Sequence, residues 1–245
     1  MRGCVTDAAG LQRNVQMRRI SIIIPTLNEA AGVERALAAL QPLRRRGHEL
    51  IVVDGGSGDG TPSLARPLAD HVLCAPRGRA SQMNSGVQRA AGEVLLFLHA
   101  DTRLPPQADR LIASGLQDSG REWGRFDIRI DGRHPLLRVV ATMMNLRSRL
   151  TGICTGDQAI FVRREAFVAC GGYPAVALME DVALSRILKA HSRPLCVAAP
   201  VRTSARRWES RGVLRTMLLM WWLRLRFFLG TPPDRLARMY ERDPR

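Results

Sequence analysis

The first hundred residues alternate between short apolar runs and segments with helical spacing. The apolar runs lie at residues 20–24, 50–53, 71–74 and 93–98, and the helical segments between them at 29–40, 61–68 and 80–91. Strands that alternate with helices of this length form parallel βαβ units with right-handed crossovers. Because these strands are apolar along nearly their whole length, helices should cover both faces of the sheet. We predict an α/β fold with a mostly parallel central sheet.

The second half of the chain is less regular but keeps both kinds of element. Helices are predicted at 108–116, 136–150 and 182–190, and strands at 126–130, 159–162 and 195–199. There is no internal repeat and no low-complexity linker. At 245 residues the chain can bury one large core. We therefore expect one Rossmann-like domain, preceded by a disordered N-terminal extension at 1–19.

A carboxylate follows the second strand, directly before a glycine-rich turn. Asp54 precedes Gly55, Gly56, Gly58 and Gly60. Ligands of open α/β sheets bind at the carboxyl ends of the strands, and glycines let backbone N–H groups approach them closely. In the dinucleotide fingerprint the acid comes about 20 residues after the glycines. The reversed order argues against an NAD-dependent oxidoreductase. An unpaired carboxylate at the end of a buried strand would be costly, which favours ligand contact for Asp54.

The charge balance predicts an affinity for anions. Lys and Arg number 37 against 22 Asp and Glu, for a net charge of +15, and Lys189 is the only lysine. Such a field attracts anions of any kind. The arginines are spread along the chain and do not alternate with aromatic residues, so no nucleic-acid partner is expected. The five scattered cysteines contain no C-x-x-C pair, which argues against a disulfide framework or zinc site and suits the cytoplasm.

Three motifs occur in order at the ends of three predicted strands. They are Pro25-Thr26-Leu27-Asn28-Glu29, Asp54 with Ser57-Gly58-Asp59-Gly60-Thr61, and His99-Ala100-Asp101. Together they resemble the family-2 glycosyltransferases of the GT-A fold, in detail the small bacterial subgroup described as radical-SAM/selenodomain-associated transferases. The resemblance runs from Ile20 to Trp208. It implies a GT-A domain at 20–208, with a nucleotide-binding half at 20–104 and an acceptor half at 105–208.

On the donor side, the resemblance implies a nucleoside pocket lined by Thr26, Glu29 and Asp54. It also implies that Arg79 reaches the base or the phosphate. Capping of a helix and pairing with its dipole is the alternative for Glu29 and for Asp59.

The family's D-x-D position, which holds Mn²⁺ or Mg²⁺ against the donor diphosphate, is occupied here by His99-Ala100-Asp101. The resemblance implies a divalent cation as cofactor, with Asp101 and His99 as ligands. Hard divalent cations prefer oxygen ligands, whereas imidazole suits Mn²⁺ better than Mg²⁺. Two alternatives stay open for His99: a hydrogen bond to phosphate, with Asp101 as sole protein ligand, or a structural role.

Met179-Glu180-Asp181 matches the family's E-D motif, in which a carboxylate deprotonates the acceptor hydroxyl. An inverting single displacement needs such a base opposite the leaving group. The resemblance implies Asp181 as base, with Glu180 beside it, and helix capping is the alternative. Asp157 and Gln158 are expected to face the acceptor or the sugar.

The segment Ser204-Ala205-Arg206-Arg207-Trp208 resembles the family's Q-x-x-R-W signature. It implies that Arg207 pairs with the donor diphosphate and that Trp208 forms a wall of the acceptor pocket. Ser204 stands where the signature has glutamine, which puts a processive, polymer-making role in doubt.

The resulting functional hypothesis is a metal-assisted, inverting glycosyltransferase of the hexosyltransferase type, with a UDP-sugar favoured over a GDP-sugar as donor. A sugar-phosphate nucleotidylyltransferase is an alternative, but that class usually has a G-x-G-T-R-like loop after its first strand. A non-enzymatic basic module that binds membrane or nucleic acid is a second alternative. It does not account for Asp54, Asp101 and Asp181 at the ends of elements.

The C-terminal segment at 209–245 is expected to be helical and amphipathic. At 100° per residue, one face collects Leu214, Met217, Leu218, Trp221, Leu225 and Phe228, and another Arg211, Arg215 and Arg226. Arg215 and Arg224 interrupt the apolar run, so it is too short to cross a bilayer. A helix in the interface of an anionic membrane is one interpretation, with attachment to the inner face of the cytoplasmic membrane and a lipid-like acceptor. A helix packed on the domain or against a second subunit is the other.

Overall fold

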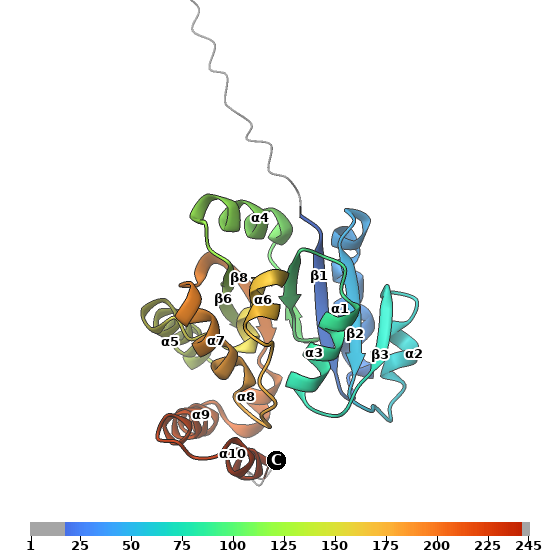
Figure 1. The fold of residues 1–245 in the computed structure, drawn as a ribbon. Helices are drawn as coiled ribbons and strands as arrows, with labels where there is room; N and C mark the ends of the chain where they lie inside the picture. The colour runs from blue at the N-terminus through green and yellow to red at the C-terminus, as the bar shows by residue number, and fades with distance from the viewer. Residues whose placement is uncertain (1–17, 242–245) are drawn as a thin grey trace, which may run out of the picture.

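The computed structural model describes residues 18–241. Their strands form one mixed sheet (Figure 1). Its strands are β1 (Ile20–Thr26), β2 (Glu49–Asp54), β3 (His71–Cys74), β4 (Val94–Phe97), β5 (Thr102–Arg103), β6 (Trp123–Asp131), β7 (Phe161–Arg163) and β8 (Leu195–Ser204). They lie in the order β3-β2-β1-β4-β7-β6-β8-β5. The first four strands along the chain pair in parallel, as predicted.

The direction of the sheet changes between β4 and β7. Strand β7 is antiparallel to β4 and to β6, whereas β8 is parallel to β6 and antiparallel to β5. Leu96, near the end of β4, therefore lies opposite Phe161, the first residue of β7. This reversal brings the segment before β7 to the end of the sheet where β1, β2 and β4 finish.

Helices cover both faces of the sheet, as the apolar strands predict. They are α1 (Ala30–Arg45), α2 (Thr61–Ala65), α3 (Arg79–Arg89), α4 (Ala108–Ser119), α5 (Leu136–Thr151), the 3₁₀ turn η1 (Gly156–Gln158), α6 (Arg164–Ala169), α7 (Glu180–His191), α8 (Arg206–Arg211), α9 (Val213–Phe228) and α10 (Pro233–Glu241). Successive residues of β1 point into two different cores. Ile22 and Ile24 pack with α1, α2, α4 and α5, and Ile23 packs with α3, α6 and α7. Both cores exclude water from β1, in accord with the α/β prediction.

Several boundaries differ from the sequence prediction. Helix α1 continues through Pro42 to Arg45, because Leu43 extends its buried face. Helix α2 is shorter than predicted, and β8 continues to Ser204. Of the expected extension at 1–19, only Arg18 and Arg19 lie within the described residues, and their side chains pair with Glu93 and Glu49.

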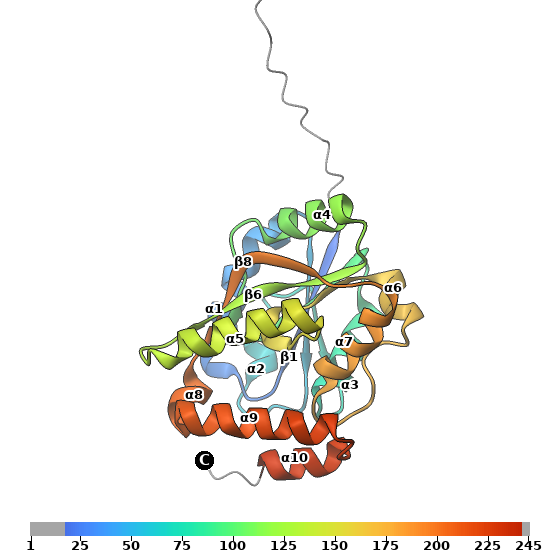
Figure 2. The same ribbon diagram turned by 90° about the vertical axis from the view of Figure 1, so that its left-hand side faces the viewer.

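Helices α9 and α10 lie across the end of the sheet where the parallel strands finish (Figures 1 and 2). Both fall within the segment expected to be helical, which Gly230 and the prolines after it divide in two. Of the helices in residues 18–241, none has the length and apolar character that a membrane crossing requires.

A buried carboxylate on β2 couples the stability of this sheet to pH. Glu49 accepts hydrogen bonds from the Ser21 hydroxyl at 2.6 Å and from the Ala91 N–H at 2.8 Å. Burial alone would raise the pKa of Glu49. These donors, with the nearby charges of Arg19 and His71, outweigh burial and hold the pKa below its ordinary value. The ionised form is therefore stabilised in the folded protein.

We expect Glu49 to contribute stability above about pH 4.5, the ordinary glutamate pKa, and to lose this contribution as the pH falls through its lower folded pKa. The test is urea unfolding at several pH values between 7 and 3. The urea concentration at half-unfolding should fall less between pH 7 and pH 3 in Glu49→Gln than in the wild type. Glu34→Gln, at an exposed position on α1, is the matched control. If the urea midpoint depends on pH equally in all three proteins, this role of Glu49 is contradicted.

Candidate active site

The turn after β2 is organised around the carboxylate of Asp54. Its Oδ2 accepts the N–H groups of Gly56 and Ser57 at 2.9 and 2.7 Å. Its Oδ1 accepts the hydroxyls of Thr26 and Ser57. Asp54 is 3% exposed, so these four donors offset the cost of burying its charge. The carboxylate is thus paired without a ligand, by the turn and by Thr26 of β1, so the cost of an unpaired acid no longer argues for ligand contact, which stays a prediction.

A second acid in this turn, Asp59, joins the first turns of two helices. Its Oδ2 accepts the Ala30 N–H at 2.9 Å, and its Oδ1 accepts the Thr61 N–H at 3.0 Å and hydroxyl at 2.6 Å. The capping alternative for Asp59 is therefore the one the structure shows. Glu29 makes no such cap, although it directly precedes α1.

The Glu29 carboxylate accepts instead a hydrogen bond from Arg206 Nη2 at 3.4 Å. Sequence reasoning missed Arg206, although it directly precedes the arginine of the expected signature. The side chain of Arg207 itself lies outside the described part of the chain. Trp208 is half-buried and packs against the core that contains Ile22 and Ile24, and its role as a wall of the acceptor pocket stays a prediction.

At the carboxyl end of β4, the His99 ring meets the turn that precedes β7. Its Nδ1 lies 3.1 Å from Asp157 Oδ1. Its Nε2 is buried and has no hydrogen-bond partner among the described residues. The ring packs directly on Gly156, where a Cβ would lie 2.5 Å from Nε2 and force the ring to shift. Asp101, two residues on, is exposed and accepts a 3.4 Å hydrogen bond from the Thr102 hydroxyl.

The first turn of α7 carries the two acids of the predicted E-D motif. Asp181 Oδ2 accepts the Gly156 N–H and Oδ1 accepts the Val182 N–H, both at 2.7 Å. Glu180 is buried, with Oε1 3.9 Å from Arg79 Nη1. Burial and then the charge of Asp181 raise the pKa of Glu180, against the opposing effect of Arg79. Glu180 therefore keeps its proton to higher pH than an ordinary glutamate.

These groups line one small cavity of about 60 Å³. Its charged and aromatic lining comprises Arg79, His99, Asp157, Glu180 and Asp181 with Arg224 of α9 and Tyr240 of α10. The sequence assigned the first five to donor, metal, acceptor and base roles, and the structure brings all five together. Thr26, Glu29 and Asp54 are not part of this lining; they belong to the neighbouring turns after β1 and β2.

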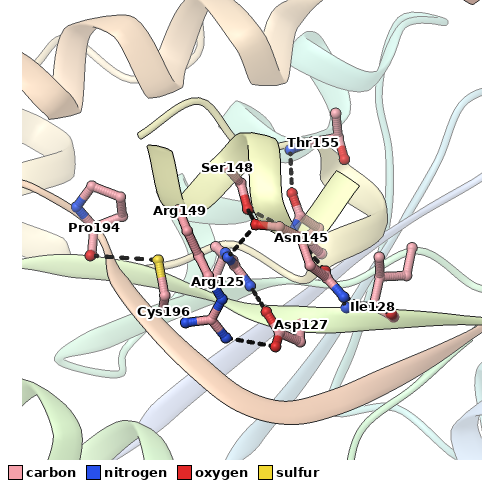
Figure 3. A network of polar contacts seen from close by, with 10 residues as sticks. Arg125, Asp127, Ile128, Asn145, Ser148, Arg149, Thr155, Pro194 and Cys196 are labelled. Carbon is pink, nitrogen blue, oxygen red and sulfur yellow. Dashed lines mark hydrogen bonds and ion pairs between the residues drawn. The ribbon is translucent and has the colours of Figure 1, made fainter. Parts of the chain in front are cut away.

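A polar network fixes the turn that carries Asp157 (Figure 3). Asn145 of α5 accepts the Ile128 N–H at 2.9 Å and donates to the Ile128 carbonyl at 3.1 Å, which holds α5 on β6. The same helix provides Ser148, whose hydroxyl accepts a 3.2 Å hydrogen bond from Gln158 Nε2. Arg125, fully buried, pairs with Asp127 below this helix.

Gln158 consequently lies inside the fold, with no exposed surface. Its Oε1 accepts the Thr155 N–H at 3.3 Å and completes the capping box of η1. This position differs from the predicted acceptor-facing one, because the amide is occupied on both sides by α5 and by its own turn. Asp157, by contrast, remains partly exposed.

The residues at the end of β4 fit a metal ion only in combination with ligand atoms from a substrate. Within residues 18–241, no three His, Cys, Asp or Glu side chains are placed to hold a metal together. Asp101 offers an exposed carboxylate, and the unpartnered Nε2 of His99 is a second candidate donor. The sequence prediction of two protein ligands is compatible with this arrangement.

Comparisons with known proteins agree with the fold. The family model described as "Glycosyl transferase family 2" matches residues 21–169. Undecaprenyl-phosphate 4-deoxy-4-formamido-L-arabinose transferase of Yersinia enterocolitica is 26% identical over 62% of this chain, and the match spans only half of that relative. The mannosyltransferase PcManGT of Pyrobaculum calidifontis, solved with GDP-Man and Mn²⁺, has a TM-score of 0.55 at 25% identity, covering 76% of this chain and 56% of its own. TarS of S. aureus, solved with UDP-GlcNAc, has a TM-score of 0.61 at 17% identity, covering 76% and 58%.

Proposed function

Because the chain belongs to glycosyl transferase family 2, we propose that it transfers a hexosyl group from a nucleoside-diphosphate sugar to a hydroxyl acceptor. The observation that supports this most is the placement of Asp181 at the His99–Asp157 pair, held by the N–H of Gly156 at 2.7 Å. His99, a candidate donor-side group at the end of β4, thus lies near Asp181, the candidate base. A UDP-sugar is the proposed donor, with a GDP-sugar as competitor, in line with the UDP-GlcNAc and GDP-Man bound by the two structural relatives.

The proposed step is an inverting single displacement. The acceptor oxygen forms a bond to the anomeric carbon while the bond from that carbon to the diphosphate breaks, and the electron pair leaves with the nucleotide. Asp181 takes the proton of the acceptor hydroxyl. Its neighbour Glu180 is less suited to this role, because it is buried beside Arg79, whereas Asp181 is partly exposed to an incoming acceptor.

We assign Asp101 and His99 as the protein ligands of a divalent cation, Mn²⁺ or Mg²⁺. Such an ion supplies Lewis-acid stabilisation of the charge that grows on the leaving diphosphate. The exposed carboxylate of Asp101 and the unpartnered Nε2 of His99, among the described residues, support the assignment. The Mn²⁺ in the P. calidifontis relative is consistent with it.

For the donor we assign Thr26, Glu29 and Asp54 to the nucleoside, and Arg79 and Arg207 to the phosphates. The turn after β2 is already fixed by Asp54, and Arg206 ties Glu29 to the start of α8. The acceptor would then enter from the side of Asp157. Arg79 lies beside Glu180 and can offer a positive charge to the same cavity.

Donor class is tested by thermal-shift measurements with UDP-, GDP- and dTDP-sugars, each with and without Mn²⁺. We expect a rise in melting temperature for one nucleotide series, larger with Mn²⁺ than without. A sugar-phosphate nucleotidylyltransferase would instead respond to a nucleoside triphosphate and release pyrophosphate. Stabilisation by triphosphates alone would contradict the proposed function.

We further propose peripheral attachment to an anionic membrane through α9. The buried residues of α9 are Val213, Thr216 and Leu223. The helix therefore packs on the domain, as one of the two interpretations expected, but through a different face from the apolar face identified in the sequence. The outer face leaves large apolar side chains exposed, namely Leu214, Leu218, Trp221, Trp222, Leu225 and Phe228. Arg215 and Arg226 lie on the same helix, and Arg226 stacks over Trp222 at 5.6 Å. An amphipathic helix of this kind suits the interface of an anionic bilayer.

In a liposome co-sedimentation assay, we expect the protein to pellet with anionic vesicles and to be released as salt is raised. The double change Arg215→Glu/Arg226→Glu should weaken this binding. A double variant with the same charge change, Arg89→Glu/Arg110→Glu, is the control, because Arg110 lies on α4 at the opposite end of the molecule from α9 (Figure 2). If the wild type stays in the supernatant at low salt, α9 does not attach the protein to membranes.

A further inference from the structure

A second and much larger cavity lies between α5, α7 and α9. Its volume is about 750 Å³, enough for an extended hydrocarbon chain. Apolar side chains form much of the lining, among them Ile153, Val182, Leu225, Phe227 and Phe228. None of the residues assigned to donor, metal or base lines this cavity. Four cationic residues also line it, namely Arg147, Arg186, Lys189 and Arg224, so its surface suits an apolar ligand that carries an anionic group.

Two of these cations, Arg147 of α5 and Arg224 of α9, come from distant parts of the sequence and have buried donors. The buried Nε and Nη2 of Arg147 and the buried Nε of Arg224 have no hydrogen-bond partner among the described residues. Burial, and then the charge of Arg224, lower the pKa of Arg147 to about 10. Two adjacent, desolvated cations with unpaired N–H groups are unfavourable unless an anion binds between them.

Arg224 lines both cavities, the large apolar one and the small one that contains Asp181. The negative charge of Asp181 acts on Arg147 as well as on Arg224. The two guanidinium groups therefore lie close to the candidate base as well as to the apolar lining.

We propose that the large cavity binds a phosphate-bearing amphiphile, with its apolar chain along the apolar lining and its phosphate between Arg147 and Arg224. Two guanidinium groups with five donors each suit a phosphate, which accepts several charge-assisted hydrogen bonds at once. The assignment of this ligand as the acceptor rests on the proposed function. A hydroxyl on the polar side of the phosphate would then face Asp181.

The surroundings of the cavity give such a ligand an entrance. Leu225 and Phe228 line the cavity and are also 55% and 80% exposed. Helix α5, on the opposite wall, exposes Met143, Leu146 and Leu150. The lining also includes the exposed residues Arg186 and Lys189, so an apolar chain would enter along Leu225 and Phe228 with cationic side chains nearby.

Direct binding tests this inference without requiring transfer activity. The probe is lysophosphatidylglycerol with a 12-carbon chain, used below its micelle concentration and measured by calorimetry. We expect it to bind at least tenfold more tightly than glycerol phosphate, which lacks the chain, and than a 12-carbon maltoside, which lacks the anion. Equal binding of glycerol phosphate would mean an ordinary anion site, equal binding of the maltoside a purely apolar one, and either result, or no binding, would overturn the inference.

Two variants make the test independent of folding failure. Arg147→Met and Arg224→Met should each weaken binding of the probe at least tenfold. Without ligand they should raise the melting temperature, by about 2–4 °C, because each removes an unpaired buried cation. Arg138→Met, at an exposed position on α5, is the matched control and should change neither quantity. Unchanged probe affinity in both variants would refute the role of the two arginines.

Donor binding separates this inference from the proposed function. If the probe binds and depends on Arg147 and Arg224 while no nucleotide sugar binds, the amphiphile site stands and the proposed transfer fails. If a nucleotide sugar binds and the probe does not, the proposed transfer stands and the amphiphile site fails.

Discussion

Asp181→Asn is expected to slow sugar transfer by about 10²–10⁴-fold, the contribution usual for a general base, with little change in donor affinity. The carboxylate lies at the start of α7, and the N–H groups of Gly156 and Val182 fix its orientation. An asparagine can keep one of these hydrogen bonds but cannot take the acceptor proton. Single-turnover rates and calorimetric donor affinity, measured on the same preparation, distinguish loss of the base from loss of binding.

Glu180→Gln is the matched comparison, since it changes the adjacent acid in the same turn. Glu180 is buried beside Arg79 and less accessible to an acceptor than Asp181, so this variant should retain most of the activity. Full activity in Asp181→Asn together with loss in Glu180→Gln would exchange the two roles. Full activity in both would show that neither acid is the base.

The second large effect is expected from removal of the divalent cation. Addition of EDTA, or the change Asp101→Asn, should reduce turnover by about 10²–10³-fold, because a metal ion contributes several kcal/mol of charge stabilisation in such sites. Asp101 is exposed, and its side chain takes part in a single 3.4 Å hydrogen bond with Thr102, so the fold should persist in the variant. Calorimetry of donor binding with and without Mn²⁺ provides the measurement.

The control is Asp118→Asn, which changes an exposed acid on α4 and should behave like the wild type. His99→Gln tests the second proposed ligand and should raise the Mn²⁺ concentration needed for half-maximal activity. Wild-type donor binding and turnover that are insensitive to EDTA would rule out the metal assignment for both residues.

The sequence predicted the parallel half of the sheet well, because β1, β2 and β4 are apolar on both faces and each is followed by a clear helical period. Strand β5, with two residues, and helices α6 and α8, with six each, are too short for any periodic pattern to show them. The antiparallel position of β7 also has no local signal. It depends on pairing with β4, more than 60 residues earlier in the chain.

The same division holds for the candidate site. Acids that follow a strand or begin a helix, such as Asp54, Asp101 and Asp181, have a recognisable sequence context. Arg147 and Arg224 lie in the middle of helices, where an arginine ordinarily faces solvent. Only the packing of α5 against α9 buries their guanidinium groups, and no pattern in either helix announces that contact.

The turn after β2 has a consequence for the kinetics of donor binding. Asp54 accepts its four hydrogen bonds in the absence of a ligand. Asp59 likewise accepts hydrogen bonds from the first residues of α1 and α2. A nucleotide that docks there therefore has no loop to order, and the entropic cost of association falls mainly on the ligand itself. Association through this turn should then be a single, concentration-dependent phase at a rate typical of rigid partners, with differences among nucleotides expressed mostly in how fast each one leaves.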